Sequence, residues 1–266
     1  MSRIGDSTVG SIAVDIFNQN NCIARSHNTV AMPLEDDILS EVGDILAQTW
    51  TVRDGKVVPE TENVSLAGGA VRLTATMLYA DLADSTALAI YDRRVAARVF
   101  KSFLASCSRI IRDRGGYIRS FDGDRVMGVF VGDYKNTTAA KAALNINYVF
   151  QTIIKPKLVA KYEVFKNGTY TLGHCVGIDT SEVMVIRGGI VNNNDLVWVG
   201  SAPNVAAKLS GIRSTPYNSW ITESVYNSLN DEAKLGPKRE DMWEKRVNVP
   251  AIPGGVGYRS RWWWKP

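Results

Sequence analysis

The chain is poor in cysteine and histidine. Its cysteines number three, and Cys22, Cys107 and Cys175 show no paired spacing. The last two lie in apolar periodic runs, so we expect reduced, structural thiols rather than disulfides or metal ligands. His27 stands in a polar leader with nothing to cluster with. His174 stands in a strand-like run, where we expect a satisfied sheet histidine rather than a catalytic base.

Long apolar runs and concentrated charge are also missing. No apolar stretch approaches the roughly 18 to 20 residues of a membrane span, and residues 1–6 lack the apolar core of a signal peptide. The formal net charge of +4 is spread along the chain rather than gathered in basic tracts. It therefore argues only weakly for a polyanionic partner, and a nucleotide would be enough. We expect a cytoplasmic protein without membrane attachment or a nucleic-acid partner.

The composition is sufficient for an enzyme-sized core, since 45% of the 266 residues are hydrophobic. We expect an N-terminal extension over residues 1–70 and one main domain over residues 71–266. Within the extension, Pro33 favours the first turn of an accessory helix. The apolar residues of this helix recur on one face, at Leu34, Ile38, Val42, Ile45 and Leu46.

The main domain alternates strand-like and helical patterns. The dipeptide Asp122-Gly123 predicts a tight hairpin in which both residues reach positive φ, and Pro156 is expected to end a helix. The order of elements predicts an α+β domain with a mostly antiparallel sheet backed by helices. The predicted strands are 73–80, 117–121, 125–131, 169–178, 183–186 and 196–199, and the predicted helices are 85–112, 137–154 and 201–210.

Two carboxylates carry the strongest functional signal. Asp81 closes an apolar strand and is followed by Leu82-Ala-Asp-Ser-Thr86, while Asp124 follows the hairpin turn. Two-metal phosphoryl chemistry needs this layout, with carboxylates from separate strands beside a loop whose amides hold phosphates. The alternatives are a helix cap for Asp81 and a turn residue for Asp124.

Three motifs in order resemble the catalytic domain of class III nucleotidyl cyclases. They are Ala80-Asp-Leu-Ala-Asp-Ser-Thr86, Gly115-Gly-Tyr-Ile-Arg-Ser-Phe-Asp-Gly-Asp124 and Gly200-Ser-Ala-Pro-Asn-Val-Ala-Ala-Lys208. The likeness covers roughly residues 71–230 and implies a ferredoxin-like palm in a head-to-tail homodimer. It also implies two divalent cations, Mn²⁺ or Mg²⁺, at Asp81, Leu82 and Asp124. The nucleotide phosphates would lie along the backbone of Leu82, Ala83, Asp84, Ser85 and Thr86.

The third motif supplies residues for the ribose and the reacting phosphate. Asn204 and Lys208 are four residues apart, so on a helix they share one face. The resemblance implies that Asn204 orients the ribose and that Lys208 stands where these cyclases usually have a transition-state arginine. Lysine neutralises charge but lacks the planar guanidinium fork. The alternative is a helix cap and a solvated lysine.

The base-reading positions depart from the purine cyclases. Ser120 stands where those enzymes carry Lys or Glu, and Val197 stands at the second reading position. Neither residue matches the side chains that recognise the purine edge in those enzymes. Tyr117 or Phe121 would flank the pocket. Asp122 is either a turn residue or an extra acid for the metal or base. Either the base is a pyrimidine or the site has lost activity.

A closer resemblance is to the pyrimidine cyclases of the Pycsar anti-phage systems of bacteria. It lies in residues 75–86, in Arg119-Ser-Phe-Asp-Gly-Asp-Arg-Val-Met127 and in Asp54-Gly-Lys-Val-Val-Pro59. It implies conversion of UTP, or alternatively CTP, to a cyclic monophosphate that activates a partner effector during infection. In the implied homodimer, Asp81 and Asp124 of one subunit face Asn204 and Lys208 of the other.

Other interpretations stay open at this point. A purine cyclase, a catalytically silent nucleotide-binding module and a diguanylate-type cyclase are the alternatives, although the Gly-Gly-Asp/Glu-Glu-Phe hairpin of the last is absent. Lys245 and Arg246 are the candidates for a further phosphate-binding cation. Three adjacent tryptophans, residues 262–264, predict a tail packed on a groove or on a partner chain rather than a ligand-stacking surface.

Overall fold

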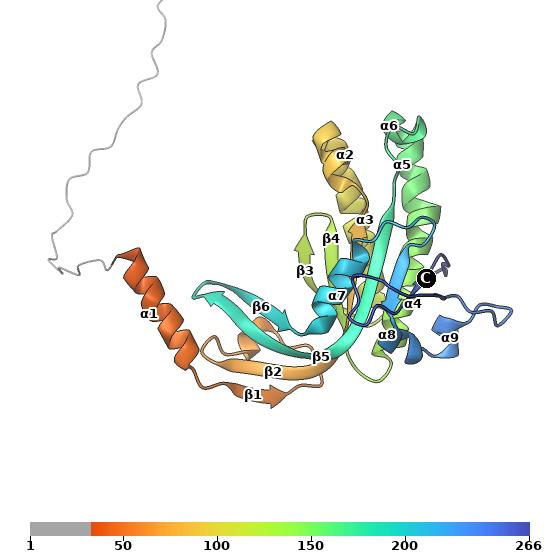
Figure 1. Cartoon of the computed structure of the whole chain (residues 1–266). Coiled ribbons are helices and arrows are strands. Elements are labelled where there is room, and N and C mark those ends of the chain that lie inside the picture. The colour runs from red at the N-terminus through yellow and green to blue at the C-terminus, as the bar shows by residue number, and fades with distance from the viewer. Residues whose placement is uncertain (1–32) are drawn as a thin grey trace, which may run out of the picture. The chain divides into compact units, whose positions relative to one another are not determined.

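A computed structural model describes residues 33–266 (Figure 1). Cys22 and His27 lie outside the described residues. The chain divides into two units, residues 1–46 and residues 47–266. Residues 47–70, which were expected to be part of the N-terminal extension, thus belong to the same unit as the sheet. Among residues 33–266, no helix is both long and apolar enough to cross a membrane.

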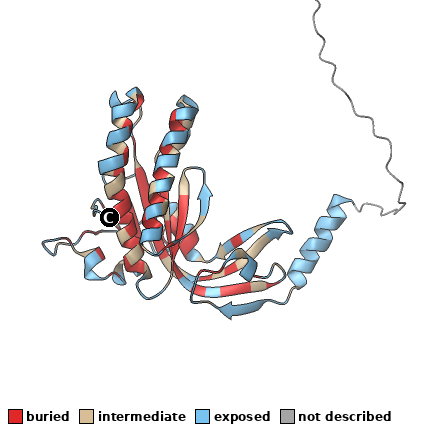
Figure 2. Cartoon of the chain, turned by 180° about the vertical axis from the view of Figure 1, so that it is seen from behind, coloured by how far each residue is buried: buried red, intermediate tan, exposed pale blue. Residues whose placement is uncertain are grey.

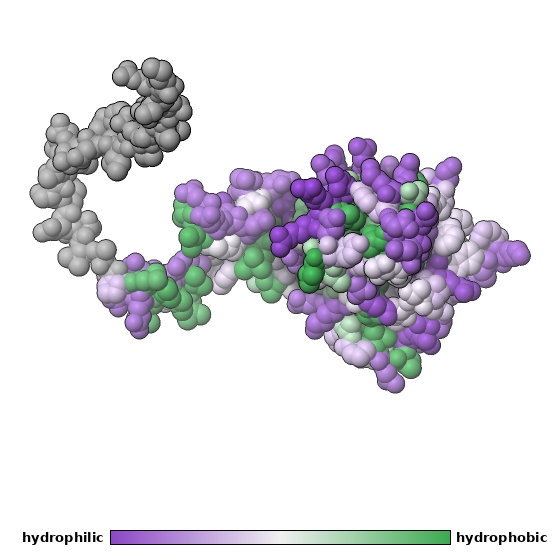
Figure 3. Space-filling view, turned by 90° about the horizontal axis from the view of Figure 1, so that it is seen from above, coloured by the Kyte–Doolittle hydropathy of each residue, from purple (hydrophilic) through white to green (hydrophobic). Residues whose placement is uncertain are grey.

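The predicted accessory helix is present as α1 (Leu34–Ala47). None of its residues is buried, and its apolar side chains are exposed to solvent. Figure 3 shows these side chains gathered along the helix. The exposed apolar residues are Leu34, Ile38, Leu39, Val42, Ile45 and Leu46.

The strands of the described residues join in one nine-stranded sheet with the central order β3-β4-β2-β5-β7-β9-β8. In addition, β1 pairs with β2 in parallel and β6 pairs with β5 in antiparallel orientation. The sheet is mostly antiparallel, as expected. The strands are β1 (Thr51–Asp54), β2 (Gly69–Leu82), β3 (Tyr117–Asp122), β4 (Arg125–Phe130), β5 (His174–Ile190), β6 (Asn193–Val199), β7 (Ser219–Thr222), β8 (Glu244–Arg246) and β9 (Gly257–Ser260).

Helices cover both faces of this sheet. On β2, Leu78, Ala80 and Leu82 pack in one core, whereas Leu73 and Met77 pack in another. Because side chains alternate along a strand, these two cores lie on opposite faces. The first core holds α3 (Arg93–Asp113) and α4 (Lys135–Val149), and Figure 2 shows their buried sides turned to the sheet. The second core holds α7 (Ser201–Ser210).

The predicted helix over residues 85–112 is interrupted. It consists of α2 (Ser85–Tyr91) and α3, which begins after Asp92. The Asp92 carboxylate accepts hydrogen bonds from the backbone N–H groups of Arg94, at 2.8 Å, and Val95, at 3.1 Å. An N-cap of this kind satisfies donors that an uninterrupted helix would have bonded internally, so the chain turns here.

The prediction that Pro156 ends the second long helix is wrong. After α4 the chain widens into a π-helical segment, η2 (Phe150–Ile154), and continues as α5 (Lys155–Lys161). Pro156 lies in the first turn of α5, where a missing N–H costs little. Three further short helices are α6 (Glu163–Lys166), α8 (Glu223–Asn227) and α9 (Asp231–Lys234).

Two further strand predictions need correction. The expected pair over residues 169–178 and 183–186 is one continuous strand, β5, because its partner β2 is long enough to bond to it throughout. The hairpin at Asp122-Gly123 exists, but Asp122 is the last residue of β3 and pairs with Arg125. The two turn residues are therefore Gly123 and Asp124. Only Gly123 has a positive φ, at +61°, which is typical of a type II′ turn rather than type I′.

The C-terminal tail packs on α4 of its own chain. The Trp264 backbone N–H donates to the Leu144 carbonyl at 3.2 Å, and the Asn145 side chain donates to the Trp264 carbonyl at 2.9 Å. The Asn147 side chain donates to the Trp262 carbonyl at 2.9 Å. The tail thus packs on its own chain, whereas the sequence left open a groove or a partner chain. Cys107 and Cys175 are free and buried, as expected.

A glycine near the start of β5 brings α7 directly onto the strand. A Cβ at Gly177 would stand 2.2 Å from the Ala206 carbonyl oxygen and 2.4 Å from the Ser210 backbone nitrogen. Both neighbours are backbone atoms, so relief requires a shift of the helix. We expect Gly177→Ala to lower the free energy of unfolding by about 3 kcal/mol, at the upper end of overpacking.

Denaturant unfolding followed by circular dichroism measures this change. Gly43→Ala is the control, because a Cβ at Gly43 meets nothing within 4 Å. Equal unfolding midpoints for the Gly177→Ala variant and the parent protein would show that α7 does not depend on this close approach.

Candidate active site

The sheet brings the two predicted carboxylates together. Ala80 of β2 pairs with Val126 of β4, so Asp81 and Asp124 lie just beyond the last pair of two adjacent strands. The negative charge of Asp124 contributes to a raised pKa at Asp81, which places the two groups within electrostatic range. The strand pairing therefore places both carboxylates at the same end of two adjacent strands.

Asp81 is largely buried, with 18% of its side chain exposed. Burial is the main cause of its raised pKa, and Asp124 raises the pKa further. A hydrogen bond and the charge of Arg213 act in the opposite direction. Two nearby carboxylates at such a depth repel each other and need a cation to offset their charge.

Arg213 supplies positive charge next to Asp81, and no sequence motif predicted this residue. Its Nη2 donates to Asp81 Oδ2 at 2.8 Å and to the Leu82 carbonyl at 2.9 Å, and its Nη1 donates to the Ser210 carbonyl at 2.7 Å. Arg213 follows α7 in a loop outside all three motifs, and no spacing rule points to it. Its guanidinium thus contacts two oxygens that were predicted to bind metal.

The oxygens at this site fit a hard divalent cation. Asp124 Oδ2 is buried and has no hydrogen-bond partner within residues 33–266. Together with Asp81 and the Leu82 carbonyl, it offers the oxygen ligands that Mg²⁺ and Mn²⁺ prefer. In the described part of the chain, no three His, Cys, Asp or Glu side chains gather around one point. A cation here would need further ligands, as Mg²⁺ commonly obtains from substrate phosphates and water.

The segment after Asp81 forms a small turn with fixed geometry. Ala83 and Asp84 make the turn, and Asp84 has a left-handed φ of +53°. The Ala83 N–H donates to the Gly173 carbonyl at 2.9 Å, and the Tyr170 hydroxyl donates to the Ala83 carbonyl. Burial, together with the charges of Asp84 and Asp124, raises the Tyr170 pKa to about 12. The hydroxyl therefore stays protonated as a donor to this loop.

The first turn of α2 follows this loop directly. Ser85 begins the helix, and the Asp84 carboxylate makes no capping hydrogen bond. The opening N–H groups of a helix lack partners inside the helix. The backbone predicted to hold phosphates thus combines a tight turn with a helix start.

Asn204 and Lys208 lie on α7 and are both exposed. The Asn204 amide donates to the Gly200 carbonyl at 3.4 Å. Among the residues from 33 onward, no hydrogen bond or ion pair joins either side chain to Asp81 or Asp124. A single chain therefore does not connect the α7 residues with the carboxylates.

The two predicted base-reading residues belong to different parts of the sheet. Val197 pairs with Ile186, which in turn pairs with Ala70 of β2. Asp81 lies eleven residues further along the same strand, which corresponds to about 36 Å of strand. One chain cannot place Val197 and Asp81 around the same small ligand.

Ser120 is exposed on β3, next to a bulge between Ile118 and Ser120. Phe121 lines a surface hollow together with Arg109 and Arg112 of α3. Tyr117 is exposed as well. These side chains do not surround a common pocket in one chain.

Other candidates have structural partners. Asp122 forms an ion pair with Arg125 at 2.6 Å, and Lys245 forms one with Glu223 at 3.2 Å. Arg246 approaches Glu244 at 3.3 Å. His174 is buried in β5, but both of its ring nitrogens lack hydrogen-bond partners within the described residues. The prediction of a satisfied sheet histidine is therefore wrong in that respect.

No protein-family model matches the chain. A uridylate cyclase of Rhodovulum sp. (strain MB263) is 46% identical over 240 residues, covering 88% of this chain and 99% of that protein. A uridylate cyclase of Xanthomonas perforans is 42% identical over 236 residues, covering 88% and 99%. The chain belongs to the uridylate cyclase family. The expectation of a nucleotidyl cyclase is confirmed.

The fold of this cyclase is also found in more distant enzymes. The adenylyl cyclase CyaB from P. aeruginosa aligns with a TM-score of 0.60 at 18% identity, covering 72% of this chain and 95% of that structure. The expected class III palm, a mostly antiparallel sheet backed by helices, is confirmed. At this identity the likeness speaks for the fold alone.

The orphaned oxygen of Asp124 makes metal binding testable in the cyclase without any reaction. We expect saturating Mn²⁺ to raise Tm, because a cation at about 100 times its Kd stabilises the folded state by about 2.7 kcal/mol. The Asp124→Asn variant should lose this shift. Differential scanning calorimetry with and without Mn²⁺ measures it.

Asp122→Asn is the matched control, because Asp122 lies two residues away and its carboxylate binds Arg125. This variant should retain the Mn²⁺-dependent shift. A shift of the same size in the Asp124→Asn variant would mean that the cation binds elsewhere.

Proposed function

We propose that this cyclase converts UTP to 3′,5′-cyclic UMP and pyrophosphate. The observation that carries the proposal is the identity of 46% over nearly the full length of a relative named uridylate cyclase. The positions that read the purine edge in other cyclases support it, since Ser120 and Val197 offer no purine code. CTP remains the second candidate, because uracil and cytosine differ at position 4 by one donor or acceptor.

Asp81, Asp124 and the Leu82 carbonyl would hold two divalent cations, Mn²⁺ or Mg²⁺. When bound, such cations lower the pKa of the ribose 3′-hydroxyl and stabilise the pyrophosphate leaving group. The orphaned Asp124 Oδ2 and the raised pKa of Asp81 support this role, because both groups gain from a nearby positive charge. For a cation to bind Asp81 Oδ2 and the Leu82 carbonyl, the Arg213 guanidinium would have to break its hydrogen bonds to both oxygens.

The remaining residues would position the substrate. The backbone of Leu82, Ala83, Asp84, Ser85 and Thr86 would wrap the β- and γ-phosphates. Asn204 would orient the ribose, and Lys208 would neutralise the charge that develops on the α-phosphate. Ser120, Phe121 and Val197 would flank the base.

A head-to-tail homodimer would complete each site. Two observations support it: the strand distance between Val197 and Asp81, and the absence of contacts from Asn204 or Lys208 to the carboxylates within the described chain. In a symmetric dimer, the carboxylates of one subunit would meet α7 of the other, and two equivalent sites would form.

The product would act as a second messenger in the bacterial cytoplasm. The resemblance to Pycsar cyclases supports a role in anti-phage defence, with a separate effector that responds to cyclic UMP. This biological role depends on the proposed conversion of UTP to cyclic UMP.

Incubation of the purified protein with Mn²⁺ and each of ATP, GTP, CTP and UTP tests the reaction. We expect cyclic UMP, identified by chromatography and mass, and a loss of at least about 100-fold in the Asp124→Ala variant because charge stabilisation is removed. A cyclic CMP product would keep the enzyme class and change the base. A cyclic purine product would contradict the assignment of Ser120 and Val197.

Complementation tests the shared site. Asp81→Ala and Lys208→Ala proteins should each be inactive, but a mixture should regain about a quarter of wild-type activity. Half of the dimers are then mixed, and each mixed dimer has one intact site. The activity is measured after subunit exchange has been shown by native mass spectrometry. No recovery in exchanged dimers would contradict the composite site.

A further inference from the structure

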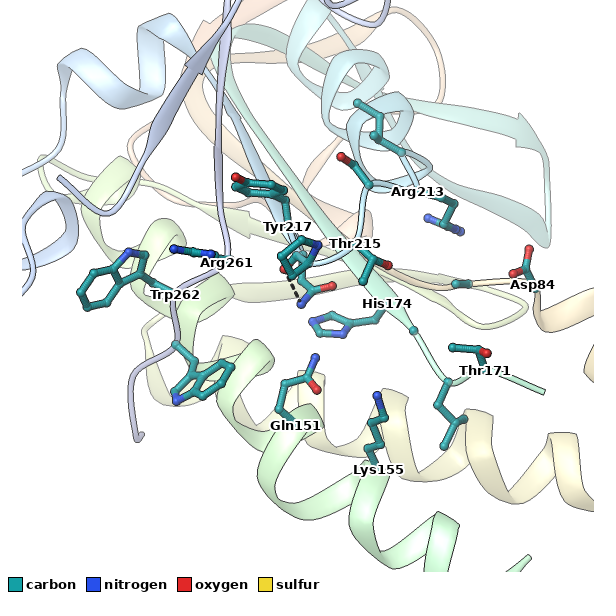
Figure 4. Close-up of a pocket in the computed structure, with 18 residues that line it drawn as sticks. Asp84, Gln151, Lys155, Thr171, His174, Arg213, Thr215, Tyr217, Arg261 and Trp262 are labelled. Carbon is teal, nitrogen blue, oxygen red and sulfur yellow. Dashed lines mark hydrogen bonds between the residues drawn. The ribbon is translucent and has the colours of Figure 1, made fainter. Parts of the chain in front are cut away.

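A cavity of about 750 Å³ lies behind the loop that follows Asp81 (Figure 4). We call it the rear cavity. Ala83 and Asp84 line one side, while α5, the start of β5, the loop after α7 and the C-terminal tail supply the rest. Asp81, Asp124, Ser120, Val197, Asn204 and Lys208 are not among its lining residues. The rear cavity therefore shares Ala83 and Asp84 with the loop proposed to wrap the UTP phosphates, but it excludes the residues proposed for the metal, the base and the ribose.

The rear cavity carries excess positive charge. Lys155, Arg213 and Arg261 line it, and Asp84 is the one carboxylate in its lining. Within residues 33–266, neither the Lys155 ammonium nor the Arg261 guanidinium has an ion pair or a hydrogen bond. Figure 4 shows Lys155 pointing from its helix toward His174, with Arg213 on one side of His174 and Arg261 on the other. Two cations without partners in the described chain, together with Arg213, which is paired with Asp81, line one cavity and suit an anion.

His174 gives an independent sign of a polar ligand. Its ring is 3% exposed and lines the rear cavity, yet neither ring nitrogen has a partner in the described chain. Burial, with the charges of Arg213 and Lys155, lowers the His174 pKa to about 3. The imidazole is neutral and keeps one donor and one acceptor. Buried polar groups are nearly always paired, so an orphaned ring indicates a missing partner.

The local backbone is also unusual at this place. Gln151 lies in the π-helical segment η2, and Lys155 follows it at the start of α5. Both side chains line the rear cavity. A π segment of this kind re-aims side chains and is frequent at functional sites.

Aromatic rings line the opposite wall. Tyr217, Trp262 and Trp263 all contribute, and the Trp263 side chain is exposed, with 49% of its surface accessible. Arg259 already stacks on the Tyr217 ring at 3.6 Å, and the Trp262 indole packs against Gly236 and the core, so the Trp263 indole is the surface that remains for a flat ligand. Stacking on aromatic side chains is how proteins commonly hold a base.

We propose that the rear cavity binds a mononucleotide distinct from the triphosphate substrate. Lys155 and Arg213, whose charges both act on His174, would hold its phosphate, His174 would supply a neutral hydrogen-bond partner, and the Trp263 indole would support its base. The volume of about 750 Å³ lies within the range of small-molecule sites.

Arg213 links the rear cavity with the catalytic carboxylates. It lines the rear cavity and at the same time donates to Asp81 Oδ2. A phosphate in the rear cavity would compete with Asp81 for this guanidinium. On the proposed function, occupancy of the rear cavity would therefore release a metal-binding carboxylate, and by linkage the two sites would influence each other.

Isothermal titration calorimetry tests the site in EDTA, without metal and without turnover. The probes are 5′-UMP and 5′-AMP, with inorganic phosphate and uridine as their separate halves. We expect one nucleotide per chain, and we expect Lys155→Ala to weaken binding at least about 10-fold. Phosphate or uridine alone should bind far more weakly, because each makes only part of the contacts.

Two variants separate the rear cavity from other sites. Lys157→Ala is the matched control, since Lys157 lies on the same helix but is not part of the lining. Lys208→Ala reports on the site proposed for UTP. Both variants should bind the nucleotide as the wild type does.

Three results would overturn the proposal. They are no heat of binding with either nucleotide, equal losses in Lys155→Ala and Lys157→Ala, and binding that disappears in Lys208→Ala while Lys155→Ala keeps it. Phosphate binding as tight as that of the nucleotides would overturn the assignment of a base to the tail. Because the titration needs no cyclase activity, its failure leaves the uridylate cyclase proposal intact, and failure of the cyclase assay leaves this one intact.

Discussion

The pairing of β2 with β5 is the constraint on which the rest of the structure depends. It runs without interruption from Ala70–Ile186 to Leu82–His174. One end carries Asp81, the turn after it and the start of the rear cavity. The other end carries β6 and Val197, while α7 packs on β5 at Gly177, near the Asp81 end. A shift of one residue in this register would turn the buried side chains of both strands to the wrong face, so the register is strongly specified.

Charge at the end of β2 is balanced by a group that comes from far away in the sequence. Burial makes the ionised form of Asp81 costly, and Asp124 adds to the cost. Arg213 offsets part of it with two hydrogen bonds, to Asp81 and to the Leu82 carbonyl. Asp124 Oδ2 has no such partner in the described chain. The site is therefore only partly neutralised, which is the electrostatic condition under which a divalent cation binds well.

Local patterns predicted much of this fold, and the failures have physical causes. The helix over residues 201–210 and the helix after Pro33 were predictable from apolar spacing and turn residues. The continuity of β5 was not, because polar residues at 179–182 resemble a turn until β2 pairs with them. Arg213 could not be predicted, because its role depends on a contact with Asp81, which lies 132 positions away in the sequence. The orphaned state of His174 likewise depends on what surrounds it in three dimensions.

One chain does not bring together the residues that are proposed to bind the nucleotide. The carboxylates lie at one end of β2, whereas Val197 pairs near its other end, and Asn204 and Lys208 remain exposed on α7. In the proposed homodimer, a two-fold axis would bring each end of one subunit to the opposite end of the other. The folded chain would then carry the cost of burying Asp81 and Asp124, and Lys208 of the partner subunit would add positive charge to the site.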